Sequence, residues 1–346
     1  GRMVFHPLYP TVNGQPRDPA DPSHPTHRLL LTPELVRAEC RVRLLSFISR
    51  APLDCPVAFV FGHQGLMNWA GAGYLDYGED LSLDLWRRGY AVDLYPSTEI
   101  ESGTLEVTAD GWLQVGRQRY EVLVLYRPDL CPATVARFFG EKLITRTALV
   151  AIGSWERDDR GEALDGLGLL PAGFRRLASA EGALEVLLTE LEQRGAGRQP
   201  PLVEPYLLFR NDQIGMPAPS GTARLVDGTV VRLAATMVSD GGDPIEETID
   251  VGGVPVEVAA EGLFAARVDG EGRVEALAAG GLRRVRGGGL DLELSAPLDV
   301  ALWRDAGGAW RGVAQGVPEV PDALKRLARD WVCLRVPPLC PVTPGA

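Results

Sequence analysis

The run Pro56-Val-Ala-Phe-Val-Phe61 is short, wholly apolar and followed directly by a glycine. Such a run is typical of a central strand in a parallel sheet, where both faces are buried. Three more runs fit the same sheet: Tyr90-Ala-Val-Asp-Leu-Tyr95, Glu121-Val-Leu-Val-Leu-Tyr126 and Ala148-Leu-Val-Ala-Ile152. We therefore predict four neighbouring strands in the first half of the chain.

Helical segments separate these strands. A helix is predicted over residues 80–88, where Gly89 marks its end, and further helices over 132–143 and 180–194. A hairpin is predicted over 104–115, with its turn at an Asp-Gly pair. Alternation of strands and helices indicates an α/β fold with helices on both faces of a parallel sheet.

The hydrophobic period changes from 3.6 to 2 after Pro201. Short strand-like runs then follow one another between residues 203 and 313, the first over 203–209 and later ones over 274–278, 290–294 and 300–303. Gly-containing turn pairs, among them Asp227-Gly228 and Gly252-Gly253, separate them. Many short strands with frequent turns predict an antiparallel β-sandwich. The fold class is thus α/β plus all-β.

These patterns divide the chain into four parts. Residues 1–31 form an extended arm, because repeated prolines exclude a helix there. Residues 32–199 form the α/β domain, which starts with a helix over 33–50. The β-sandwich domain covers 200–316, and 317–346 are predicted to hold a C-terminal helix over 321–331 and a Pro-rich tail.

Composition excludes several classes of protein. The 346 residues carry a formal net charge of −11 and no basic block, which argues against a nucleic-acid partner. No apolar run is long enough to cross a membrane and no signal peptide is visible, so we expect a cytoplasmic protein without a membrane partner. The five cysteines are widely spaced without a C-x-x-C pair, so free thiols are expected. We expect no metal and no cofactor, since His24 and His27 lie on the Pro-rich arm instead of a helix.

The loop over residues 62–78 is the most informative segment for function. It follows the first strand of the α/β domain, and such folds bind ligands beyond the carboxyl ends of their strands. Its polar and aromatic side chains suit the hydroxyls and apolar faces of sugars, unless they satisfy one another within the loop. Six of them are the candidate substrate-binding residues: His63, Gln64, Asn68, Trp69, Tyr74 and Asp76.

No catalytic residue is assigned. Cys131 follows a predicted strand, as a nucleophilic cysteine does in amidotransferase-like folds, but its neighbours Arg127-Pro-Asp-Leu-Cys-Pro include no glycine. His63 is the one histidine outside the arm, so a second histidine to act as base is missing from the sequence. The glycines of the 62–78 loop do not form a dinucleotide fingerprint, and no P-loop occurs.

Four stretches carry a family resemblance. They are the arm from His6-Pro-Leu-Tyr-Pro, the helix 33–50 with the strand after it, the run Asp110-Gly-Trp-Leu-Gln-Val-Gly, and the sandwich segments at Val274-Glu-Ala-Leu and Val300-Ala-Leu-Trp. Together they resemble the C-terminal part of large bacterial glycoside hydrolases. In those proteins a catalytic (β/α)-barrel is followed by an amidotransferase-like α/β domain, called the β-galactosidase trimerisation domain, and then a β-sandwich.

This resemblance implies a flavodoxin- or amidotransferase-like sheet and a non-catalytic role. The implied partners are a glycoside, a catalytic barrel of the same polypeptide and further copies in a homo-oligomer. The chain departs from the family after Phe138-Phe139-Gly140, where Glu-Lys-Leu-Ile-Thr-Arg-Thr replaces the usual Gly-Gly turn. The barrel that holds the family's paired acids is not in this sequence, so no catalytic residue carries over.

Two alternatives stay open. One is a free-standing carbohydrate-binding or sensory module. The other is an amidotransferase-like hydrolase that uses Cys131.

Overall fold

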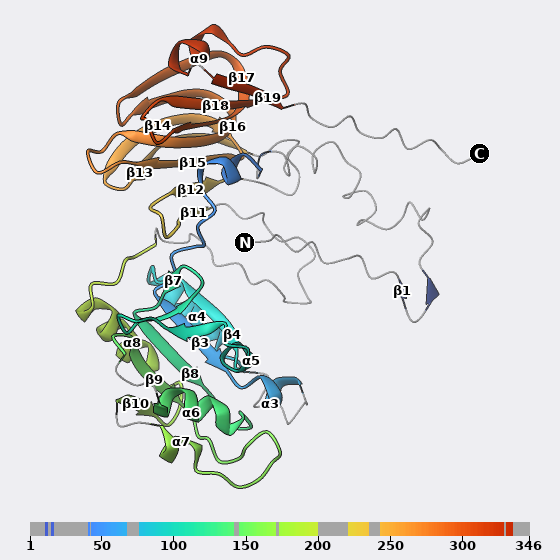
Figure 1. The fold of residues 1–346 in the computed structure, drawn as a ribbon, viewed down its shortest axis with the longest axis vertical. Helices are drawn as coiled ribbons and strands as arrows, with labels where there is room; N and C mark the ends of the chain where they lie inside the picture. Colours follow the sequence, from blue (N-terminus) through green and yellow to red (C-terminus); the bar gives the residue numbers. More distant parts are fainter. Residues whose placement is uncertain are drawn as a thin grey trace. The chain divides into compact units, whose positions relative to one another are not determined.

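The computed structural model describes residues 11–12, 15–16, 41, 43–67, 76–141, 145–170, 173–199, 221–234, 243–328 and 330–334. The chain divides into two compact units (Figure 1). One, here called the α/β unit, is Pro52–Leu208, and the other, the β unit, is Gly1–Ala51 with Phe209–Ala346. Within the expected arm, strands β1 (Thr11–Val12) and β2 (Gln15–Pro16) form an antiparallel pair.

The α/β unit is built on a five-stranded sheet in the order β10-β9-β8-β3-β4. Every neighbouring pair is parallel. Numbered along the chain, the order is 2-1-3-4-5, the flavodoxin-like arrangement. The parallel α/β fold predicted from the sequence is confirmed. The strands are β3 (Val57–Phe61), β4 (Val92–Pro96), β8 (Val122–Tyr126), β9 (Ala148–Ile152) and β10 (Phe174–Leu177).

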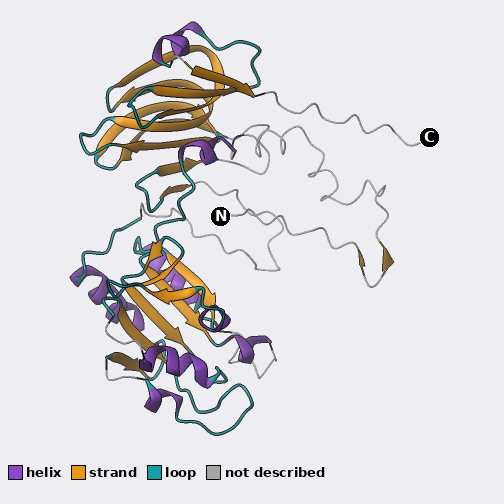
Figure 2. Cartoon of the chain, in the orientation of Figure 1, coloured by secondary structure: helices purple, strands orange, loops and turns teal. Residues whose placement is uncertain are grey.

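Helices cover both faces of this sheet, as Figure 2 shows. On one face Leu85 and Leu187, from α4 and α8, pack against the sheet, and on the other Phe139 of α6 does so together with a small three-stranded sheet. None of the helices in the described part of the chain could cross a membrane. The helices are α3 (His63–Met67), α4 (Glu79–Arg87), α5 (Thr98–Glu101), α6 (Ala133–Glu141), α7 (Gly166–Leu169) and α8 (Ala183–Gln193), and the small sheet holds β5 (Leu105–Val107), β6 (Leu113–Val115) and β7 (Gln118–Arg119).

The β unit contains a nine-stranded sheet. Its pairs are antiparallel except the last, β18 with β19, which is parallel. The all-β prediction is therefore confirmed. The strands are β11 (Gly221–Arg224), β12 (Val230–Leu233), β13 (Pro244–Val251), β14 (Val254–Glu261), β15 (Leu263–Val268), β16 (Val274–Gly287), β17 (Leu290–Arg304), β18 (Trp310–Gln315) and β19 (Asp330–Leu334).

The two longest strands join two parts of this sheet. The register of β16 with β17 shifts between Ala279 and Leu282. Before the shift β16 also pairs with β15, and after it with β14. Side chains from both parts, such as Phe264 and Ile249, belong to one buried cluster. Because β16 changes its neighbouring strand at this shift, the two parts of the sheet enclose one core, as two layers would.

A helical stretch over residues 43–48 covers the opposite side of strands β12, β15, β16 and β17. Leu44 and Ile48 are buried there with Ala265 and Ala301. The sequence placed this helix at the start of the α/β domain, whereas its described residues pack within the β unit. Apolar spacing predicts that a helix has a buried face but not which sheet it covers.

The helix predicted over 321–331 is shorter in the structure. Helix α9 is Asp322–Leu327, and strand β19 begins at Asp330. Extending the helix to Trp331 was wrong, because this residue lies in β19 opposite Gly312 of β18. The predicted strand over 203–209 lies outside the described residues.

Candidate functional site

The strand order reverses between β3 and β8, so the crevice at their carboxyl ends is the expected ligand position. A Cβ added to Gly62, directly after β3, would lie 2.8 Å from the carbonyl oxygen of Arg127, directly after β8. Arg127 and Leu130 have positive φ angles of 44° and 66°. Non-glycine residues in this conformation are strained and often found at functional sites. The loops after the two strands are therefore tightly fitted together.

Gln64 forms hydrogen bonds within the protein at this crevice. The buried Ser97, which follows β4, donates from Oγ to Gln64 Oε1 at 3.1 Å. The backbone N–H of His63 donates to the same Ser97 Oγ at 3.4 Å. Gln64 Nε2 donates to a Glu101 carboxylate oxygen at 3.4 Å. The amide of Gln64 is thus used to hold α3 against the end of β4 and helix α5.

Asp76 fastens the far end of the 62–78 loop to strand β8. One carboxylate oxygen accepts a hydrogen bond from the Tyr126 hydroxyl at 2.9 Å and pairs with Arg127 Nη2 at 3.1 Å. The other oxygen accepts from the Gly78 N–H at 3.0 Å. Burial, followed by the bond to Asp76, raises the pKa of Tyr126 to about 12, so Tyr126 stays a donor.

The structure describes three of the six candidate residues. Two of them lie together, and the third belongs to a separate group of hydrogen bonds. His63 and Gln64 meet at Ser97, and Asp76 meets Arg127. Asn68, Trp69 and Tyr74 lie outside the described residues. Sequence reasoning missed Ser97 and Arg127, although each directly follows a predicted strand, which is the position where this fold presents side chains to ligands.

Cys131 lies at the same end of the sheet, between β8 and α6, and is fully buried. Burial, and to a smaller extent the negative charges of Glu101, Asp129 and Asp159, raises the pKa of its thiol to about 12, against a lowering effect of a hydrogen bond with Ser97. Reactive cysteines have the opposite shift, because the thiolate is the nucleophile. Cys131 is a protonated, enclosed thiol at neutral pH.

A half-buried polar group lies on the face of the sheet covered by the small sheet. Asp93 of β4 accepts hydrogen bonds from the hydroxyls of Tyr120 at 3.0 Å and Tyr95 at 3.3 Å. The two hydroxyls are 2.7 Å apart. Burial raises the pKa of Asp93, although bonds from Tyr120, Cys55 and Tyr95 act against that shift. We call these four residues the Asp93 cluster.

The β unit has an aromatic surface of its own. The rings of Phe47 and Trp303 stack with centroids 5.8 Å apart and an interplanar angle of 19°. Phe47 is 40% exposed. The two rings line an open hollow of about 380 Å³ together with residues 46 and 48–50. A flat aromatic surface beside polar groups is a feature of sites that bind molecules with both apolar faces and hydroxyls.

Within the described ranges, no three His, Cys, Asp or Glu side chains gather as a metal site requires. No protein-family model, no curated protein and no solved structure matches this chain. The structure shows a parallel α/β unit and a mostly antiparallel β unit. The resemblance to glycoside hydrolases stays a prediction.

Proposed function

We propose that this chain is a non-catalytic region of a carbohydrate-active glycoside hydrolase. The catalytic barrel would belong to the same polypeptide, and the α/β unit would support it, cap its active site or provide contacts in a homo-oligomer. One observation carries the proposal: two candidate side chains at the carboxyl ends of the strands, Gln64 and Asp76, are bonded to other residues of the protein. Gln64 is held by Ser97 and Glu101, and Asp76 by Tyr126 and Arg127.

This internal bonding bears on chemistry directly. Glycosidic hydrolysis needs two carboxyl groups facing a sugar, one to donate a proton and one to act as base or nucleophile. Asp76 is bonded to the hydroxyl of the buried Tyr126, to the Arg127 guanidinium and to the Gly78 N–H, so both of its carboxylate oxygens already have partners within the protein. A crevice of this kind supports a neighbouring structure better than it supports a reaction.

Activity measurements test the proposal. The purified chain is expected to release no chromophore from aryl α- and β-glycosides of common hexoses and pentoses. Turnover that survives repurification and disappears in Asp76→Asn would overturn it. Sequencing the reading frame upstream of Gly1 is the second test, and the expected result is a coding region for a barrel of about 250 residues.

A carbohydrate-binding module is the second candidate, and the stacked Phe47 and Trp303 rings favour it. An apolar sugar face can lie on such rings while its hydroxyls reach polar groups at the rim. Titration calorimetry with galactose, glucose and their oligomers would detect this function. Under this second candidate, Trp303→Ala and Trp69→Ala would separately remove binding at the two candidate surfaces.

The amidotransferase-like alternative depends on a reactive Cys131. Peptide-resolved alkylation with iodoacetamide near pH 8 is expected to modify the exposed Cys333 and to leave the buried Cys131 unmodified in the folded protein. Unfolding in urea should make both react, which confirms that the peptides are detected. Fast labelling of Cys131 in the folded chain would restore this alternative.

A further inference from the structure

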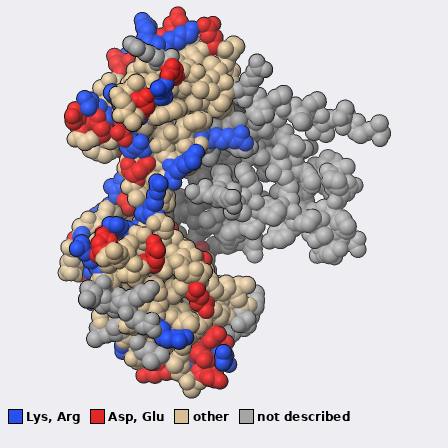
Figure 3. Space-filling model, viewed as in Figure 1, with Lys and Arg blue, Asp and Glu red and all other residues tan. Residues whose placement is uncertain are grey.

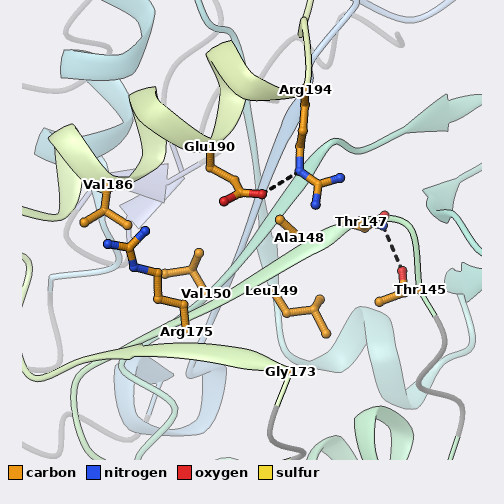
Figure 4. Close-up of a pocket in the computed structure, with 10 residues that line it drawn as sticks. All are labelled: Thr145, Thr147, Ala148, Leu149, Val150, Gly173, Arg175, Val186, Glu190 and Arg194. Carbon is orange, nitrogen blue, oxygen red and sulfur yellow. Dashed lines mark hydrogen bonds and ion pairs between the residues drawn. The ribbon is translucent and has the colours of Figure 1, made fainter.

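A hollow of about 410 Å³ lies beside strand β10, the edge strand of the parallel sheet. Figure 4 shows its walls: helix α8 contributes Val186, Glu190 and Arg194, and β10 contributes Arg175. Strand β9 forms its floor, from Thr147 to Val150. The hollow thus combines an apolar floor with charged side chains from two different elements.

Strand alternation places Arg175 on the α8 side of the sheet. Phe174 is buried on the other side, where its ring meets that of Phe139 at 5.1 Å. Arg176 also belongs to that side, because its Nη2 donates to the Leu170 carbonyl at 2.9 Å. Since successive side chains of a strand point to opposite faces, Arg175 faces α8. It pairs in register with the buried Val150 of β9.

The charges of the hollow do not cancel. Glu190 is the acidic residue of its lining and accepts a hydrogen bond from Arg194 Nε at 2.8 Å, one turn further along α8. Arg194 Nη1 also donates to the Arg146 carbonyl at 2.5 Å. The exposed side chain of Arg175, in contrast, forms no ion pair or hydrogen bond within the described ranges. Within the part of the chain that the structure describes, the Arg175 guanidinium therefore has no partner beside this apolar floor.

This local excess of positive charge runs against the charge of the whole chain, which is −11. On the face drawn in Figure 3, acidic and basic side chains are intermixed over both units. An overall negative protein repels anions at long range, so an anion can bind only where a concave surface supplies local positive charge. The hollow beside β10 meets that condition.

We propose that this hollow binds the oxyanion group, carboxylate or phosphate, of a small molecule. Arg175 provides the principal contact, because its planar fork of N–H donors matches two oxygens of such a group. Arg194, held in place by Glu190, adds a second positive charge at the opposite wall. Ala148, Val150 and Val186 offer apolar contact to the remainder of the ligand.

Titration calorimetry on the full chain tests the proposal, with inorganic phosphate and galacturonate as probes and galactose as the neutral counterpart of the latter. At least one of the two anions is expected to bind with a stoichiometry of one through Arg175. If galacturonate alone binds, the ligand is a carboxylate. If phosphate alone binds, it is a phosphate compound.

Two matched variants decide whether the hollow is the site. Arg175→Gln is expected to weaken anion binding at least tenfold, whereas Arg176→Gln, the neighbouring arginine on the opposite face, leaves it within twofold. Val186→Glu, which adds a negative charge to the same hollow, should weaken binding as Arg175→Gln does. Melting curves without ligand confirm that each variant is folded.

The proposal is overturned if neither anion binds saturably, or if Arg175→Gln and Arg176→Gln reduce binding equally. Unchanged anion affinity in both Arg175→Gln and Val186→Glu would also overturn it. If Arg175→Gln does not fold, Val186→Glu and Arg175→Lys answer the question. The lysine keeps the charge but loses the fork of donors, and an intermediate affinity is expected.

Discussion

At the scale of single residues, the Asp93 cluster is the buried polar arrangement with the clearest energetic consequence. Its half-buried carboxylate is partly removed from water and depends on hydroxyl donors for compensation. Removing one donor leaves this charge with fewer partners, which costs more than the loss of an ordinary hydrogen bond. Small changes to the side chains of this cluster should therefore have a large effect on the free energy of unfolding.

Tyr120→Phe is expected to lower the free energy of unfolding by about 1.5–3 kcal/mol, because it removes a hydrogen bond to a charged group. Tyr90→Phe is the matched control. Tyr90 is equally buried, but its hydroxyl partner is the side chain of Arg198, which is largely exposed. Urea unfolding of both variants measures the difference, and equal losses would contradict the importance assigned to Asp93.

The raised pKa of Asp93 also predicts how stability varies with pH. The folded protein binds a proton at Asp93 more readily than the unfolded chain, whose carboxyl keeps the ordinary value of 3.8. The contribution of Asp93 to stability therefore falls as pH rises from that value through the raised pKa. Wild type and Asp93→Asn should differ in the slope of unfolding free energy against pH from about pH 4 upward. Parallel slopes would contradict this.

The sequence predicted part of the crevice at this scale. His63 was a candidate because it follows a strand that was recognisable by composition alone. Its neighbour Ser97 was not, because the contact depends on β4 lying beside β3, and strand order is not written in any local pattern. Bonds between loops far apart in sequence appear only once the topology is known.

At the scale of elements, composition decided which strands could be predicted. The central strands β3, β8 and β9 are nearly all apolar because both of their faces are covered. Strand β10, Phe-Arg-Arg-Leu, was missed because it lies at the edge and exposes its two arginines. Only residues 274–278 of β16 were predicted, because a glycine pair follows them, and β17 was predicted as 290–294 and 300–303, because a proline lies between these runs.

The bend of β16 depends on Gly280. A Cβ there would lie 2.6 Å from both the Arg41 side chain and the Glu261 carbonyl oxygen. Gly280→Ala is therefore expected to destabilise the β unit by about 1–3 kcal/mol, the usual range for an overpacked site. Gly307→Ala is the control, since the nearest atom to its Cβ would be 3.4 Å away. Thermal unfolding should separate the two, and equal melting temperatures would refute the steric argument.

At the scale of the whole molecule, each unit has a core of its own, and the helical stretch 43–48 belongs to the β unit. Composition was enough to predict the two fold types. It was not enough to assign this helix, since any apolar sheet could bury Leu44.

Leu44→Ala is expected to lower the stability of the β unit by about 2–5 kcal/mol, because a fully buried leucine leaves a cavity. Hydrogen-exchange mass spectrometry should show faster exchange in strands β12, β15 and β16, which Leu44 packs against. Phe47→Ala, at a position 40% exposed, should have a smaller effect. Loss of protection confined to β3 and β8 would contradict this assignment.

The β unit is made of two separate pieces of chain, with the whole α/β unit between them. During synthesis on the ribosome, the helical stretch 43–48 emerges long before the strands that cover Leu44 and Ile48. The α/β unit, in contrast, is one continuous piece and can fold as soon as it has emerged. The apolar face of this helical stretch therefore stays uncovered until strands β12, β15, β16 and β17 have been made.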